Sequence, residues 1–150
     1  MGRVSVKGVL IGGILDIFAT FVLAIPLMAI VMVQLHFTDI PEAERTAALA
    51  KAIAPGSWYY LIGLGLGSLC SILAGYVAAR IARHDELLNG AFSAWLCVLL
   101  GLYGWDSGTH ATTIAAHGGW LVLSPILGAL GGYIRLRSMS TNLPRIARRP

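Results

Sequence analysis

Residues 58–80 read WYYLIGLGLGSLCSILAGYVAAR, and this stretch decides the fold class. It has no charged side chain before Arg80, and it is long enough to cross a bilayer, which takes roughly 20 apolar residues in a helix. Aromatic residues open it and an arginine closes it, as expected for a helix anchored at two membrane interfaces. The stretch predicts a transmembrane helix over 58–79. Inside it, small residues recur at every fourth position: Gly63, Gly67, Ser71, Gly75 and Ala79.

Three more apolar stretches accompany this one, so the chain as a whole has the composition of a membrane protein. Hydrophobic residues make up 57% of the 150 residues and charged residues 12%, whereas soluble domains carry about 25% charged residues. Across all four stretches, Asp16 is the one charged residue. We therefore predict an all-α fold, a four-transmembrane-helix bundle that forms a single integral membrane domain over 1–150. Its spans are about 8–33, 58–79, 87–105 and 118–134, followed by a basic tail over 135–150.

The basic residues predict how the chain is oriented. Of the 11 Lys and Arg residues, all but Arg45 and Lys51 lie at the N-terminus, in the 80–83 turn or in the C-terminal tail. By the positive-inside rule these segments face the cytoplasm, so both termini are cytoplasmic and the protein is multi-pass. The expected location is the bacterial cytoplasmic (inner) membrane. Aromatic residues that favour interfaces mark the opposite side: Trp58, Tyr59, Tyr60, Tyr103, Trp105 and Trp120.

A short extracytoplasmic surface helix is expected over about 40–53, after the first span. Asp39 is a suitable N-cap, and Glu42 three residues later completes the pattern of a capping box. Pro55 and Gly56 end the helix. We interpret it as a lid or spacer, with a ligand-binding cap as the alternative.

Helix packing is the expected role of the small residues. The series from Gly63 to Ala79 has a shorter counterpart at Gly128 and Gly132 in the fourth span. Small residues at this spacing bring helix backbones close together, either within one chain or between two copies. A substrate groove along the same face is the alternative interpretation.

Asp16 is the acid inside a span, and it has two interpretations. Ionisable residues within the membrane are costly, so they point to ion or proton sites. The alternative is structural: a hydrogen-bonded acid that joins helices, with Ser71, Tyr76, Trp95 or Arg80 as its partner.

Two polar clusters lie at the ends of the spans. The cytoplasmic turn between the second and third spans contains Arg80, Arg83, Asp85, Glu86 and Asn89. Acids at a helix start and bases at a helix end complement the helix dipoles, which explains this turn structurally; contact with a partner or a lipid headgroup is the alternative. On the outer side, Asp106, His110 and His117 are candidate metal ligands, since imidazole and carboxylate suit zinc or copper.

The segment 74–91 resembles a pattern in uncharacterised small four-helix bacterial inner-membrane proteins. It reads AGYVAARIARHDELLNGA. In those proteins the pattern is Gly-Gly-aromatic-x-Ala-x-Arg-x-Ala, a polar turn, and Leu-x-x-Gly-Ala, with Ala74 here in place of the first Gly. The resemblance implies an inner-membrane location and no particular activity.

These patterns lead to one functional expectation and two alternatives. We expect a packing or accessory component of the membrane, or an oligomeric one, that is not an enzyme and uses no cofactor. Its partners would be the lipid bilayer and a second copy or another membrane protein, and not nucleic acid. One alternative is a small proton- or cation-coupled transporter or channel that uses Asp16. The other is a membrane protein that binds a metal on its outer face.

Overall fold

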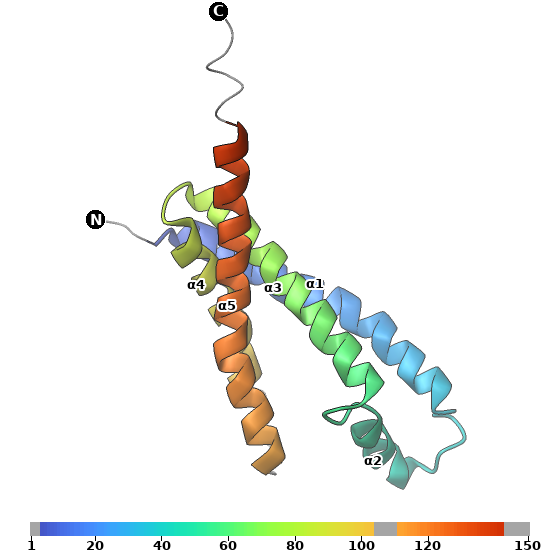
Figure 1. Cartoon of the computed structure of the whole chain (residues 1–150). Coiled ribbons are helices and arrows are strands. Elements are labelled where there is room, and N and C mark those ends of the chain that lie inside the picture. Colours follow the sequence, from blue (N-terminus) through green and yellow to red (C-terminus); the bar gives the residue numbers. More distant parts are fainter. Residues whose placement is uncertain (1–3, 104–110, 143–150) are drawn as a thin grey trace, which may run out of the picture. The chain divides into compact units, whose positions relative to one another are not determined.

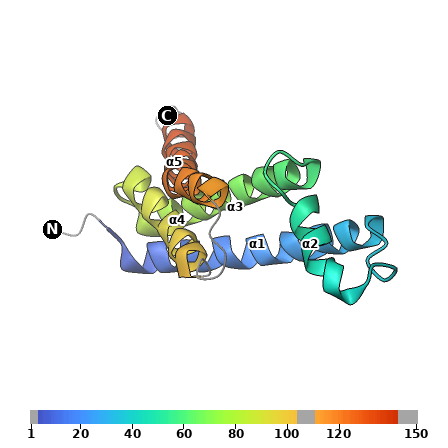
Figure 2. The same cartoon turned by 90° about the horizontal axis from the view of Figure 1, so that it is seen from below.

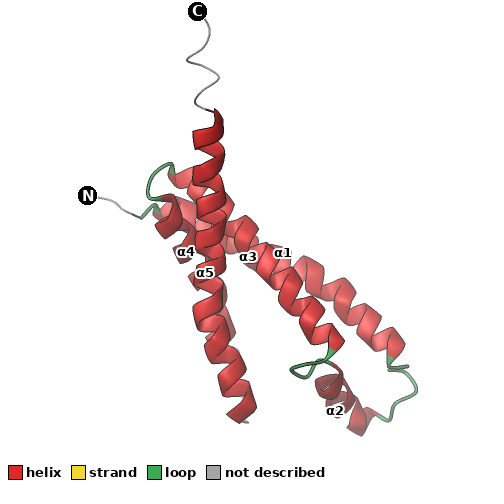
Figure 3. Ribbon diagram, in the orientation of Figure 1, coloured by secondary structure: helices red, strands yellow, loops and turns green. Residues whose placement is uncertain are grey.

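The computed structural model describes residues 4–103 and 111–142, and within these ranges the chain is helical with no strand (Figures 1 and 3). The all-α prediction is confirmed. The described helices are, in chain order, α1 (Val6–Gln34), α2 (Glu42–Ala52), α3 (Trp58–Ala82), α4 (Glu86–Tyr103) and α5 (Ala111–Asn142).

Two of these helices, α1 and α3, are long and apolar enough to cross a membrane. They have 29 and 25 residues, with mean hydropathies of 2.5 and 1.9 over their most apolar windows. At about 1.5 Å per residue, each is longer than the roughly 30 Å hydrocarbon core of a bilayer. The described residues of α4 and α5 do not meet the same length and hydropathy criteria, so the four-span arrangement stays a prediction.

Helices α1, α3 and α5 extend beyond the apolar stretches that predicted them. The difference is largest for α5, which covers 111–142 where the apolar stretch covers 118–134, and which contains Pro125 in its interior. Hydropathy marks the part of a helix that suits lipid, whereas the backbone hydrogen bonds continue into the polar flanks. The apolar pattern therefore locates a helix better than it locates its ends.

The predicted capping box before α2 was wrong. The N-cap is Pro41, no side chain caps the helix, and α2 begins at Glu42. The carboxylate of Asp39 instead accepts a hydrogen bond from the Thr38 hydroxyl at 3.2 Å. Proline disfavours the helical conformation at the residue before it. Ile40 therefore cannot start the helix, and Asp39 lies too early to cap it.

The chain divides into two compact units, which share the long helices α1 and α3. The first comprises residues 1–17 and 68–150, and the second comprises residues 18–67. In the second unit, the Tyr59 hydroxyl donates a hydrogen bond to the side-chain oxygen of Gln34. These two residues lie at the start of α3 and the end of α1, so the bond closes the segment that contains α2.

Glycine backbones bring the helices of the first unit together. A Cβ atom added to Gly75 of α3 would lie 2.8 Å from the Gly128 Cα of α5, and one added to Gly90 of α4 would lie 3.1 Å from the Gly132 nitrogen. Real Cβ atoms do not tolerate the first distance. The helices α4 and α5 accordingly lie side by side in both views (Figures 1 and 2). Helix α1 joins this group through Gly12, whose added Cβ would lie 2.9 Å from the Ser93 Cβ.

The core of this unit is made of small and polar residues. Its buried members are Asp16, Cys70, Ser71, Ala74, Ala78, Ala79, Ala82, Asn89, Ser93, Ala94 and Ser124. The large apolar side chains point away from it: Ile14, Leu69 and Val122, for example, are more than 60% exposed. This is the reverse of a water-soluble protein, whose fully buried residues include most of its large aliphatic side chains.

Candidate functional site

The buried carboxyl of Asp16 is the centre of the candidate site. Helix α1 carries it into the core of the first unit, where its exposed fraction is 0%. The hydroxyl of Ser71 on α3 lies 3.3 Å from one carboxyl oxygen and 3.2 Å from the other. Of the four hydrogen-bond partners expected for Asp16, Ser71 is the one that lies within hydrogen-bond distance of it. The pair therefore links α1 to α3 through the one polar contact that Asp16 makes within the described residues.

Glycines explain why this acid can lie so deep. Gly12 is one turn before Asp16 on α1, and a Cβ atom there would lie 2.8 Å from the Ala78 Cβ of α3. Gly13 meets the side chain of Leu96 on α4 at similarly short distance. With no side chain at either position, α3 and α4 close over α1 and exclude solvent from Asp16.

The chemistry open to Asp16 follows from its surroundings. A carboxylate has about four lone-pair sites for hydrogen bonds, and a single hydroxyl donates to one of them at a time. No lysine, arginine or histidine of the described residues forms an ion pair with it. An unpaired charge in an apolar interior costs several kcal/mol. The site can therefore hold a neutral acid, or a carboxylate that has taken up a small cation.

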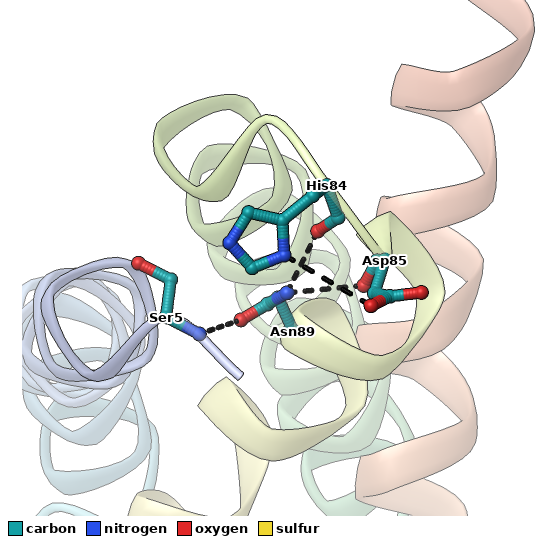
Figure 4. A network of polar contacts seen from close by, with 4 residues as sticks. All are labelled: Ser5, His84, Asp85 and Asn89. Carbon is teal, nitrogen blue, oxygen red and sulfur yellow. Dashed lines mark hydrogen bonds and ion pairs between the residues drawn. The ribbon is translucent and has the colours of Figure 1, made fainter. Parts of the chain in front are cut away.

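A second polar cluster occupies the turn between α3 and α4 (Figure 4). Asn89 is fully buried, and its side-chain oxygen accepts a hydrogen bond from the Ser5 backbone N–H at 2.7 Å. Its amide group donates to the carbonyls of His84 and Asp85 at 2.9 and 3.1 Å. Asn89 thus ties the start of α1 to the turn, a contact that its predicted place in the cytoplasmic turn did not indicate.

The other members of this turn lie nearer the surface. Arg80 is exposed in the last turn of α3, and Glu86 begins α4. Arg83, just after α3, and Asp85, just before α4, have positive φ angles of 58° and 43°. At Arg83 this is the left-handed conformation that commonly follows the last residue of a helix. The side chains of His84 and Asp85 approach to 4.0 Å as an exposed ion pair, which contributes little to stability.

The small residues of α3 face different partners along the helix. Ser71, Gly75 and Ala79 are buried in the first unit, whereas Gly63 and Gly67 are half-buried in the second. Gly128 and Gly132 lie against α4, and Gly128 also lies against Gly75. Five close-packed glycines were missed: Gly8, Gly12, Gly13, Gly90 and Gly131. The four-residue spacing of Gly8, Gly12 and Asp16 was a signal for the α1 contacts.

The candidate metal ligands of the outer loop lie largely outside the described residues. Asp106 and His110 fall in the gap between α4 and α5, and His117 lies in α5 at a position whose side chain is not described. Within the described residues, no three His, Cys, Asp or Glu side chains are grouped to hold a metal. The metal site stays a prediction.

The comparisons with known proteins found no match to this chain, whether against protein-family models, curated proteins or solved structures. The resemblance of segment 74–91 to small bacterial inner-membrane proteins therefore stays a prediction.

Replacing Asn89 by Ala is expected to release the start of α1. The change removes the acceptor of the Ser5 N–H and the side-chain donor to the carbonyls of His84 and Asp85, at a cost of about 1–3 kcal/mol. The Asp85 carbonyl still accepts from the residue 89 backbone N–H. Hydrogen exchange at the Ser5 amide should accelerate. Ser5→Ala is the matched control, because it keeps that N–H and removes only the Oγ atom that accepts from the Gly8 N–H. The control should accelerate exchange at Gly8 and leave Ser5 protected. Unchanged exchange at Ser5 in the Asn89 variant would contradict this assignment.

Proposed function

We propose that this chain is a four-span integral membrane protein of the bacterial inner membrane, with both termini in the cytoplasm. The observation that carries the proposal is the reversed distribution of side chains, with small and polar residues inside and large apolar residues outside. A surface of large apolar side chains is stable in contact with the acyl chains of lipid and not in contact with water. In lipid, helices associate through close van der Waals packing of small residues, which the Gly75–Gly128 contact provides.

The ends of the helices support the proposed orientation. Helix α3 begins at Trp58, whose side chain is 72% exposed, and carries Arg80 in its last turn. Trp is enriched at membrane interfaces, and Arg on the cytoplasmic side. Helix α5 runs past Arg135 and Arg137 before it ends. Both helices would then enter from the outer face and finish at the cytoplasmic face.

The role that fits this architecture best is a packing or accessory component, acting alone as an oligomer or beside another membrane protein. In the second unit the apolar half of α1 is almost wholly uncovered, with Val31 as its buried residue and Phe21, Val22 and Ile25 exposed. A helix surface of this kind contacts lipid or another membrane helix.

Labelling of single cysteines tests the orientation. In a chain carrying Cys70→Ala and Cys97→Ala, one exposed position is changed to cysteine, either Thr46→Cys in α2 or His84→Cys in the turn before α4. A maleimide that cannot cross the inner membrane should label the first variant in intact cells. It should label the second only after permeabilisation. Labelling of both before permeabilisation, or of the His84 variant alone, would refute the proposed topology.

A second candidate function is proton or cation coupling at Asp16. The observation in its favour is the full burial of this carboxyl beside a single hydroxyl donor and no countercharge among the described residues. The Asn89 amide uses both of its donors and its oxygen in hydrogen bonds to backbone groups, whereas the Asp16 carboxyl faces one hydroxyl and keeps spare acceptor sites. Such a carboxyl is suited to take up and release a proton or a small cation.

Asp16→Asn separates these two roles. The amide oxygen still accepts from the Ser71 hydroxyl, so the folded protein should be retained, with a stability change within about 1–2 kcal/mol. The amide cannot exchange a proton. In proteoliposomes holding a pH-sensitive dye, an imposed membrane potential should drive proton entry through the parent protein and not through the variant. Equal fluxes, or a parent flux no greater than that of empty liposomes, would eliminate the transport role.

A further inference from the structure

Arg135 of α5 has an unusual environment. Its Nε atom is buried and has no hydrogen-bond partner. Its Nη1 atom lies 3.5 Å from the Ser138 hydroxyl, which is long for a hydrogen bond, and that hydroxyl already donates to the Arg135 carbonyl at 2.7 Å. A guanidinium carries five N–H donors. Among the donors of Arg135, the Nε–H is therefore the one that is shut away from water without an acceptor in the described residues.

The position of Arg135 in the fold is set by the glycines one turn earlier. A Cβ atom on Gly131 would lie 2.7 Å from the Tyr76 nitrogen of α3, and one on Gly132 would lie 3.1 Å from the Leu87 Cα of α4. Arg135 comes four and three residues after these contacts. Residues at such spacings share a helix face, so Arg135 rises from the face of α5 that meets both α3 and the start of α4.

Two further arginines belong to the same corner of the first unit. Arg80 follows Tyr76 by one helical turn on α3, and Arg83 lies in the connection to α4. None of these arginines lies within ion-pair distance of a carboxylate of the described residues. The corner thus holds three arginines as well as the carboxylates of Asp85 and Glu86, and one of its guanidinium donors, the Nε–H of Arg135, is buried without a protein acceptor. This is the environment of an anion-binding site.

We propose that Arg135, assisted by Arg80 and Arg83, binds the phosphate group of an anionic phospholipid. A phosphate oxygen accepts readily from Nε and an Nη of one guanidinium, and this paired geometry favours arginine over lysine. Basic pockets between membrane helices on the cytoplasmic side hold such headgroups. The assignment of the phosphate to a lipid rests on the proposed function, since only that orientation puts this corner at the cytoplasmic leaflet.

The test uses the purified full-length chain in neutral detergent, titrated with phosphatidylglycerol, with phosphatidylcholine or with inorganic phosphate. Binding is measured by native mass spectrometry and by the shift in thermal unfolding. Phosphatidylglycerol should bind and raise the unfolding temperature, and phosphatidylcholine should do so much less.

Arg135→Ala should weaken phosphatidylglycerol binding about tenfold or more, the equivalent of one lost charge-assisted hydrogen bond. Arg45→Ala is the matched control, because that arginine donates to the Ile40 carbonyl in the second unit. It should leave binding unchanged.

Equal binding of the two lipids, or unchanged binding by Arg135→Ala, overturns the site. Stabilisation by inorganic phosphate as great as that by phosphatidylglycerol overturns the lipid assignment. If Arg135→Ala does not fold, Arg135→Lys serves instead: it keeps the charge and loses the paired geometry, so undiminished binding by that variant overturns the proposal. Because micelles impose no orientation, a negative result here leaves the cysteine-labelling result intact, and failed labelling leaves this binding measurement intact.

Discussion

The contact between glycine backbones in the first unit is the constraint on which the other features depend. Gly75, Gly90, Gly128 and Gly132 join α3, α4 and α5 at distances where a single Cβ atom would collide with the neighbouring backbone. In a bilayer, apolar side chains gain nothing by leaving lipid for another helix, so close van der Waals contact has to supply the association. Such contact requires short side chains at the crossing points, and glycine gives the closest approach.

The same close packing explains why the core is polar. Helices this close together leave room for Ala and Ser, and for a few medium-sized side chains in selected places. Asn89 and Asp16 occupy two of these places, and they differ in how well they are satisfied. The side chain of Asn89 forms hydrogen bonds with the backbone of Ser5, His84 and Asp85, and so connects the start of α1 to the α3–α4 turn. Asp16 faces one hydroxyl, and this surplus of acceptors is what makes it the candidate ion site.

Sequence reasoning succeeded where the signal is local and failed where it is tertiary. Apolar length predicted four of the helices, because hydropathy is a property of a continuous segment. The start of α2 was misplaced because the effect of Pro41 on Ile40 outweighed the capping potential of Asp39.

The tertiary contacts were harder to predict. Asn89 was predicted only as a member of the cytoplasmic turn, because its bond to Ser5 joins positions 84 residues apart and no pattern in either segment indicates it. The small-residue spacing of α3 indicated a packing face but could not identify its partner. Gly128 packs against Gly75 because the fold brings α5 to α3, and the sequence around Gly75 does not indicate this.

One comparison tests the central claim, that backbone contact at glycine holds the helices together. Gly75→Ala and Gly65→Ala add the same methyl group to the same helix. The first would meet the Gly128 backbone, whereas the second has nothing within 4 Å. In detergent, thermal unfolding of the purified protein should show Gly75→Ala to be destabilised by about 1–3 kcal/mol. Gly65→Ala should be unchanged, or more stable by up to about 1 kcal/mol. Equal stability of the two variants would contradict the claim.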